Sequence, residues 1–174
     1  ISYLLNSNSI ILQLIKTEIL NNKNLNFDLN FYADEVQNSN NFIKINLNSK
    51  IKEGLIDIDN TRFSWRDSAD VFLENSLIYI KNGELILDGK FSLSIKNYEE
   101  IYKFLLTPKN FRKEFKNIEN NFIYNFDQKI LNLNNILIDK KNNKDVNKTL
   151  ESLIFTKNKL QNRVYLKNIL NKAL

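Results

Sequence analysis

Residues Ser76 to Ile95, SLIYIKNGELILDGKFSLSI, predict the central hairpin of the molecule. Asn82-Gly83 lies between two apolar runs. An Asn-Gly pair in that place is the strongest short-range hairpin signal, because both turn residues must adopt positive φ. After the turn, apolar residues keep every second position up to Ile95, with Gly89 in the same phase. We therefore predict a second strand of roughly 35 Å, with a bulge or a close approach at Gly89.

The period of two continues upstream of this hairpin and predicts an antiparallel meander over residues 25–96. A change of parity at Asn60-Thr61 predicts a bulge or turn inside it. The alternation gives the sheet one apolar and one polar face, and a sheet this wide must hide the apolar face by curling or by gaining a cover. The earlier predicted strands lie at residues 25–32, 43–47, 56–58 and 63–65.

Helical patterns precede and follow the meander. Apolar residues at helical spacing predict an amphipathic helix over Ile10–Leu20, capped near Ser7 or Ser9, within the N-terminal segment 1–20. A helical insert is predicted at residues 97–116. It comprises a helix over Tyr98–Leu106, with Asn97 as N-cap, and a short basic helical turn over Asn110–Lys116.

The C-terminal third predicts a hairpin over residues 118–139, joined near Asp127-Gln128 and kinked at Asn134-Asn135, then a helical tail over 145–174. In the tail we expect helices over Val146–Phe155, capped by Asp145, and over Val164–Leu174. The predicted fold class is α+β, mainly β. We expect a single domain over residues 1–174: a curled, groove-like antiparallel meander with a helical insert and N- and C-terminal amphipathic helices.

Composition excludes several kinds of chemistry. The chain has no Cys and no His, so it has no disulfide, no Cys or His zinc, haem or iron–sulfur ligands, and no Ser–His–Asp or Cys–His catalysis. Asp57 and Asp59 share one strand face, which suits a metal or an acid/base pair; we interpret them as the solvent face of an amphipathic strand. No catalytic residue, metal or cofactor is predicted. The lack of Met, with Ile at position 1, predicts a fragment of a longer chain.

The charge pattern does not favour a nucleic-acid partner. Lys and Arg number 25 against 20 Asp and Glu, a net charge of +5. The cations are scattered, whereas nucleic-acid binders carry a basic stripe or patch. The densest basic segment, Lys140–Lys148, is also rich in Asn, and we interpret it as a solvated loop. No apolar run approaches the roughly 20 residues that span a bilayer.

The apolar and aromatic residues of the predicted strands allow three interpretations: a closed core, a groove for apolar ligands, or a platform for stacked bases. Leu and Ile neighbours with few interleaved cations favour the first two. In the groove interpretation, acyl chains contact thirteen residues: Ile45, Leu47, Phe63, Trp65, Leu85, Leu87, Phe91, Leu93, Phe122, Tyr124, Phe126, Leu131 and Leu133.

Several segments resemble, in order along the chain, recurring segments of AsmA-like proteins. Each segment alone is a weak indication, because it follows the general pattern of β-meanders. The resemblance depends on the order of the segments. The segments are GLIDIDNTRFSW at Gly54–Trp65, SLIYIKNGELILDGK at Ser76–Lys90, YKFLLTPKNFR at Tyr102–Arg112, YNFD at Tyr124–Asp127, LQN at Leu160–Asn162, and Asn168–Ala173.

The resemblance implies a C-terminal-side portion of a large periplasmic protein, anchored to the inner membrane through an N-terminal helix absent from this chain. AsmA-like proteins are associated with outer-membrane homeostasis, and related members are expected to carry phospholipid along an apolar groove. The implied partners are phospholipid acyl chains, and the membrane through the missing N-terminal part. No catalytic residues are implied. A structural or scaffolding β module with a closed core remains an alternative, as does, less favoured, a nucleic-acid-binding module.

Overall fold

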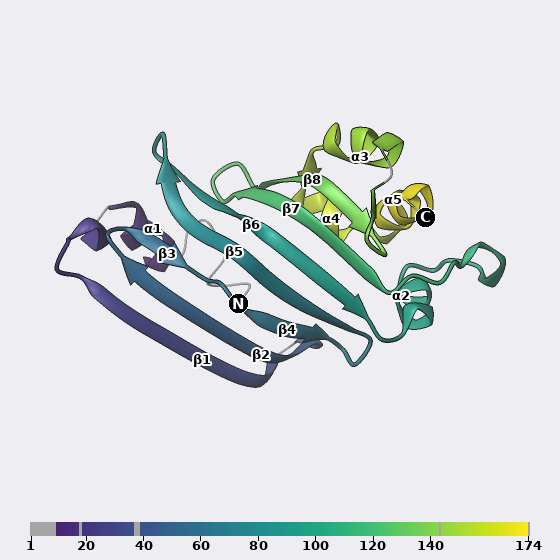
Figure 1. Cartoon of the computed structure of the whole chain (residues 1–174), viewed down its shortest axis with the longest axis horizontal. Helices are drawn as coiled ribbons and strands as arrows, with labels where there is room; N and C mark the ends of the chain where they lie inside the picture. The colour runs from purple at the N-terminus through teal and green to yellow at the C-terminus, as the bar shows by residue number, and fades with distance from the viewer. Residues whose placement is uncertain (1–9, 18, 37–38, 143, 174) are drawn as a thin grey trace.

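The computed structural model describes residues 10–17, 19–36, 39–142 and 144–173. They form one ten-stranded sheet with short helices around it (Figure 1). The main path of neighbours is β1-β2-β3-β5-β6-β7-β8-β10, and each paired strand is antiparallel to its neighbour. This confirms the predicted mainly β, α+β class and the meander.

The strands match the predicted sheet but extend beyond it. β3 and β4 both lie between β2 and β5, so they are two halves of one interrupted strand. The interruption falls at Asn60, where φ is 61°, and confirms the predicted break. The strands are β1 Asn26–Val36, β2 Ser39–Lys52, β3 Leu55–Asp57, β4 Arg62–Trp65, β5 Ala69–Lys81, β6 Glu84–Ile95, β7 Asn117–Asn125, β8 Ile130–Ile138, β9 Lys141–Asn142 and β10 Phe155–Thr156.

The helices lie around this sheet. α1 and α2 are at opposite ends of the long axis, and α3, α4 and α5 gather beside β8 and β10 (Figure 1). The helices are α1 Ile10–Lys16, η1 Ile19–Asn21, α2 Tyr98–Phe104, η2 Lys109–Phe111, α3 Lys144–Glu151, α4 Lys157–Gln161 and α5 Arg163–Ala173.

The β5–β6 hairpin has the predicted turn, with φ of 53° at Asn82 and 78° at Gly83. The predicted close approach at Gly89 is also confirmed. A Cβ at Gly89 would lie 2.2 Å from the Oγ and 2.9 Å from the Cα of Ser76. The β5–β6 register shifts between Glu74 and Leu77, which places Ser76 in a bulge facing Gly89. Glycine at position 89 therefore lets the bulged backbone approach β6.

The insert differs from the prediction in its second half. Asn97 caps α2 as expected, accepting the Glu100 N–H at 3.3 Å. The predicted helical turn over 110–116 forms only in part, because the 3-10 turn η2 ends at Phe111 and residues 112–116 have no regular secondary structure. The carboxylate of Asp139 accepts the N–H groups of Lys116 and Asn117 at 2.8 and 2.9 Å, which aligns the start of β7 beside β8.

The predicted kink at Asn134-Asn135 is confirmed by a φ of 52° at Asn135 and a shifted β7–β8 register. The tail departs more from prediction. Asp145 lies in the first turn of α3 instead of capping it, α3 ends at Glu151, and α4 was not predicted. Phe155, expected in a helix, pairs with Leu131 in β10 and is 2% exposed, so its burial against β8 outweighs local helical preference. α1 ends at Lys16, and the predicted caps Ser7 and Ser9 lie outside the described residues.

Candidate apolar binding face

Strand register places twelve of the thirteen predicted groove residues on one side of the sheet. Directly paired residues point to the same face, and paired rows cross several strands, such as Phe63–Val71–Leu93 and Leu87–Tyr124–Leu131. Twelve of the thirteen share this face within β2, β4, β6, β7 and β8. Phe126 follows β7, and its ring lies 4.9 Å from that of Tyr124. We term these thirteen residues the apolar face.

The apolar face is partly covered. Four of its residues are buried: Ile45, Leu85, Phe122 and Phe126. Leu85 is completely inaccessible and Phe126 is 3% exposed. The other nine are half-buried, and none is exposed. In this conformation the nine half-buried residues are partly accessible to solvent, whereas Leu85 and Phe126 belong to the core.

α1 covers one end of the apolar face. Ile15 packs in the core cluster that contains Leu85 and Phe126. The next residue, Lys16, forms an ion pair with Asp127 in the turn between β7 and β8. The second carboxylate oxygen of Asp127 accepts the backbone N–H of Leu85 at 2.9 Å. This ion pair ties α1 to the same strand end that its apolar residue covers.

α2 covers the opposite end. The ring of Phe104 meets Trp65 edge-on at 5.2 Å. The Arg66 guanidinium lies 4.8 Å from the centre of the Trp65 ring, and that of Arg163 lies 4.4 Å from the centre of Phe104. Cations at these distances are attracted to the aromatic faces. Between the two covers, Phe91 and Phe122 lie 6.0 Å apart on the central strands.

β1 extends the apolar face with a row that the sequence-based list left out. Phe27, Leu29 and Phe31 pair with the side of β2 that carries Leu47. Their exposed fractions are 41%, 49% and 49%, higher than those of the thirteen predicted residues. Their alternation with polar residues was the signal that could have placed them in the site.

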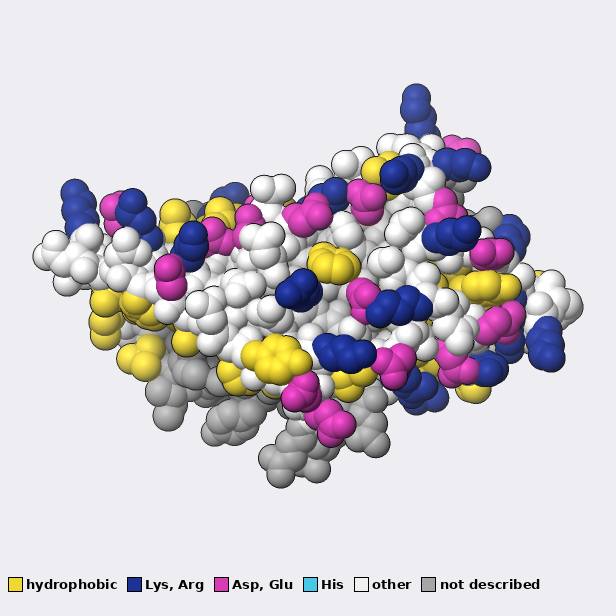
Figure 2. Space-filling view, turned by 60° about the horizontal axis from the view of Figure 1, so that its bottom comes forward, with side chains coloured by type: hydrophobic (Ala, Val, Ile, Leu, Met, Phe, Trp, Pro, Cys, Tyr) yellow, Lys and Arg dark blue, Asp and Glu magenta, His cyan; other side chains and the backbone are white. Residues whose placement is uncertain are grey.

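The opposite face carries most of the charged side chains of the sheet, with Phe72, Leu77 and Ile123 exposed among them. Lys90 on β6 reaches Glu74 on β5 at 3.3 Å and Glu119 on β7 at 2.8 Å, so one cation links three strands. The hydrogen bond to Glu119, aided by the one to Glu74, raises the pKa of Lys90 against the effect of burial. Figure 2 shows a surface of interspersed cations and anions with isolated hydrophobic side chains, and more hydrophobic atoms along its lower margin. The cross-strand ion pairs of Lys90 therefore distinguish this face from the apolar face.

Asp57 and Asp59 accept hydrogen bonds from backbone N–H groups and do not project freely into solvent. An Asp57 oxygen accepts the Asp59 N–H at 2.8 Å, and Asp59 accepts the N–H of Ser76 in the β5 bulge. Both residues are half-buried. They stabilise the break between β3 and β4 and the bulge beside it. Within the described part of the chain, no three acidic side chains converge as metal ligands.

Two surface depressions lie away from the apolar face. The first, of about 250 Å³, is lined by residues of the α2–β7 segment and by Asn171 of α5. The second, of about 440 Å³, lies between the start of β7 and the Asp139 turn. Neither is lined by any of the thirteen residues. Both depressions therefore lie outside the apolar face, which is a partly covered surface of the sheet.

No family model matches the chain, and no curated protein and no solved structure resembles it significantly. Among the helices of the described residues, none has both the length and the apolar character needed to cross a bilayer. The resemblance to AsmA-like segments therefore stays a prediction from the sequence.

Asp127→Asn is expected to make the free energy of unfolding less dependent on pH in the acidic range. Burial acts to raise the pKa of Asp127, but hydrogen bonds from Lys16 and from the Leu85 N–H outweigh it and hold the pKa below its usual 3.8. The Asp127 carboxylate therefore binds a proton more readily in the unfolded chain than in the folded protein. The stabilisation is complete above the unfolded pKa and is lost as pH falls through the lower folded pKa.

Urea unfolding of both proteins at pH 7 and pH 2 measures this effect. We expect the variant to be less stable at pH 7 by about 0.5–1 kcal/mol, as for a partly exposed ion pair. The difference should shrink at pH 2. A difference that is the same at both pH values would contradict the assignment of the ion pair to Asp127.

Proposed function

We propose that this chain is a non-enzymatic domain whose apolar face holds phospholipid acyl chains during lipid transport in the cell envelope. One observation supports the proposal. Twelve apolar residues from β2, β4, β6, β7 and β8 share one face, while the other face carries cross-strand ion pairs such as Lys90 with Glu119. The resemblance to AsmA-like segments suggests the periplasm, anchoring through a segment absent from this chain, and a role in outer-membrane homeostasis.

The proposed mechanism is transfer of acyl chains from water to the half-buried residues of the apolar face. Each buried methylene contributes about 0.8 kcal/mol. The exposed row Phe27, Leu29 and Phe31 leaves the β1 side accessible, so a chain enters there without unfolding the core around Leu85. Headgroups stay at the hydrated margin, where scattered Lys side chains attract their phosphates.

Photo-crosslinking tests this function directly. A benzophenone amino acid is placed at Leu93 or Phe31 on the apolar side, and at the neighbouring Ser92 or Asn30 as controls that point to the other side. Each purified variant is irradiated with vesicles containing radiolabelled phospholipid. We expect several-fold more label on the apolar-side variants than on their controls. Equal labelling, or none in variants whose circular dichroism is unchanged, would refute the proposal.

A closed structural module is the second candidate. It is favoured by the complete burial of Leu85 and by the packing of Ile15 from α1 over the same cluster. In that case the helices are permanent parts of the core, and the half-buried residues are the margin of a packed sheet. The same experiment separates the two, since a closed module predicts no lipid capture at Leu93.

A further inference from the structure

The segment between α2 and β7 forms a protrusion that the apolar face does not explain. It projects from one end of the molecule beyond α2 (Figure 1). Leu106 and Phe111 within it are 69% and 61% exposed. Large apolar side chains held in water on a projection are typical of surfaces that bind another phase or partner. We term residues 105–113 the insert tip.

The insert tip itself contains Lys109, Arg112 and Lys113 and no acidic residue. From residue 103 to 116 there are five Lys or Arg and one Glu. Lys103 pairs with Glu100, and Arg112 pairs with Glu99, both acids of α2. Lys116 lies 4.0 Å from a carboxylate oxygen of Glu114. Lys109 lies between the two apolar residues in sequence and is exposed. The tip therefore combines apolar side chains with a local excess of cations.

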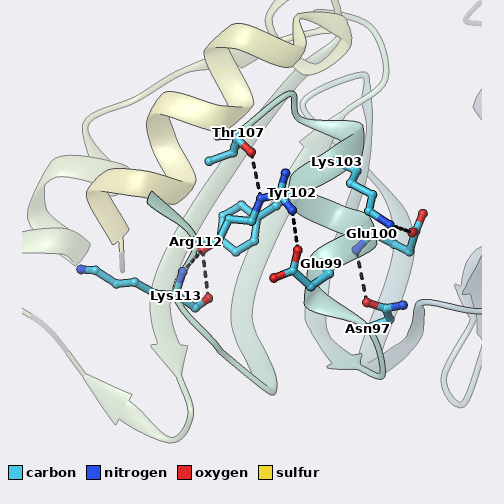
Figure 3. A network of polar contacts seen from close by, with 8 residues as sticks. All are labelled: Asn97, Glu99, Glu100, Tyr102, Lys103, Thr107, Arg112 and Lys113. Atoms are coloured by element: carbon cyan, nitrogen blue, oxygen red, sulfur yellow. Dashed lines mark hydrogen bonds and ion pairs between the residues drawn. The ribbon is translucent and has the colours of Figure 1, made fainter. Parts of the chain in front are cut away.

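The base of the insert tip is held by polar contacts (Figure 3). The hydroxyl of Tyr102, which is fully buried, donates to the Lys113 carbonyl at 3.1 Å and accepts the Lys113 N–H at 3.2 Å. Arg112 donates from Nε to the Thr107 carbonyl at 2.9 Å. The Tyr102 bonds tie the C-terminal end of the tip to α2, and the Arg112 bond holds the two ends of the tip together. Leu106 and Phe111 are thus presented in a defined arrangement, which reduces the entropy lost on binding.

We propose that the insert tip docks on an anionic lipid bilayer. Leu106 and Phe111 enter the interfacial region, and Lys109 lies at the level of the phosphates. Apolar side chains combined with nearby Lys or Arg are the pattern of proteins that lie on membrane surfaces. The positive charge complements anionic headgroups. Two separate apolar residues are also better suited to insertion into a bilayer than to a broad protein interface.

This proposal does not rest on lipid binding by the apolar face, but the two surfaces are adjacent. Phe104 of α2 contacts Trp65, so the docked tip brings that end of the apolar face towards the bilayer.

Co-sedimentation with vesicles of phosphatidylglycerol and phosphatidylcholine in equal parts tests the docking. The variants are Leu106→Asn and Phe111→Asn; Asn suits the φ of 56° at position 106. We expect each to weaken binding about tenfold. The control Ile19→Asn removes an apolar side chain of 63% exposure at the other end of the molecule, and it should leave binding unchanged. Lys109→Gln should weaken binding about fivefold, with less effect at high salt.

Insertion of the tip into the bilayer is measured separately, by fluorescence quenching. In Phe111→Trp, brominated lipids should quench a larger fraction of the fluorescence than in the parent, whose one Trp is Trp65 of the apolar face. Parent protein that does not bind anionic vesicles, or tip variants that bind as the parent does, would overturn the proposal. A dimer without vesicles that Leu106→Asn abolishes would also overturn it, by assigning the tip to a second copy of the chain. Crosslinking at Leu93 is independent of vesicle docking, so each proposal can fail alone.

Discussion

Phe126→Ala is expected to lower the free energy of unfolding by about 3–5 kcal/mol, the usual cost of emptying a buried aromatic site. Phe126 is 3% exposed and packs in the core cluster with Leu85 and Ile15. Its ring also meets Tyr124 edge-on at 4.9 Å. The substitution leaves a cavity at the place where α1 meets the sheet, so it weakens the docking of α1 as well as the strand packing.

Urea unfolding followed by circular dichroism measures this loss. Phe111→Ala is the matched control, because the same side chain is removed from a site of 61% exposure. We expect that control to change stability by less than about 0.5 kcal/mol. Equal effects of the two substitutions would show that Phe126 is not in the core.

Gly89→Ala is expected to destabilise the sheet by about 2–3 kcal/mol, because overpacking a tight site forces a shift of side chain or backbone. The new Cβ would lie 2.2 Å from the Oγ, 2.8 Å from the Cβ and 2.9 Å from the Cα of Ser76. Ser76 is completely buried and sits in the β5 bulge, so it has little room to move. Chemical denaturation of the variant gives the size of the effect.

A second substitution identifies the cause. Ser76→Gly removes the two nearest side-chain atoms but leaves the Cα at 2.9 Å, so the double variant should recover part of the loss. Gly83→Ala is the control: φ is 78° at Gly83 but no heavy atom lies within 4 Å of the new Cβ. Its cost of about 1–2 kcal/mol comes from the backbone, and Ser76→Gly should not relieve it. No recovery in the Gly89→Ala background would contradict the steric explanation.

The local pattern of residues was sufficient to predict much of the sheet. The turn at Asn82-Gly83 requires positive φ at two adjacent residues, and this preference belongs to the residues themselves. The parity of β6 follows from the alternation between Leu85 and Ile95, which also placed the groove residues of this strand on one face. The N-cap at Asn97 was predictable for the same reason, because a cap involves only residues a few positions apart.

The errors lie where distant segments compete with local preference. The residues after η2 do not continue as a helix, because Asp139 accepts the N–H groups of Lys116 and Asn117. Phe155 joins β10 because its ring is buried beside β8. Neither partner is a neighbour in sequence, so the pattern of charges and apolar residues in one segment carries no information about it.

The alternation of the strands determined which residues share a face, because parity depends only on consecutive residues. Which of them are covered was decided by tertiary structure. Lys16 and Asp127 are 111 residues apart in sequence, and their ion pair holds α1 over Leu85 and Phe126. The exposure of Phe111 was likewise decided by the fold, since its segment projects from the body. Coverage depends on contacts between remote segments, and a local pattern does not contain them.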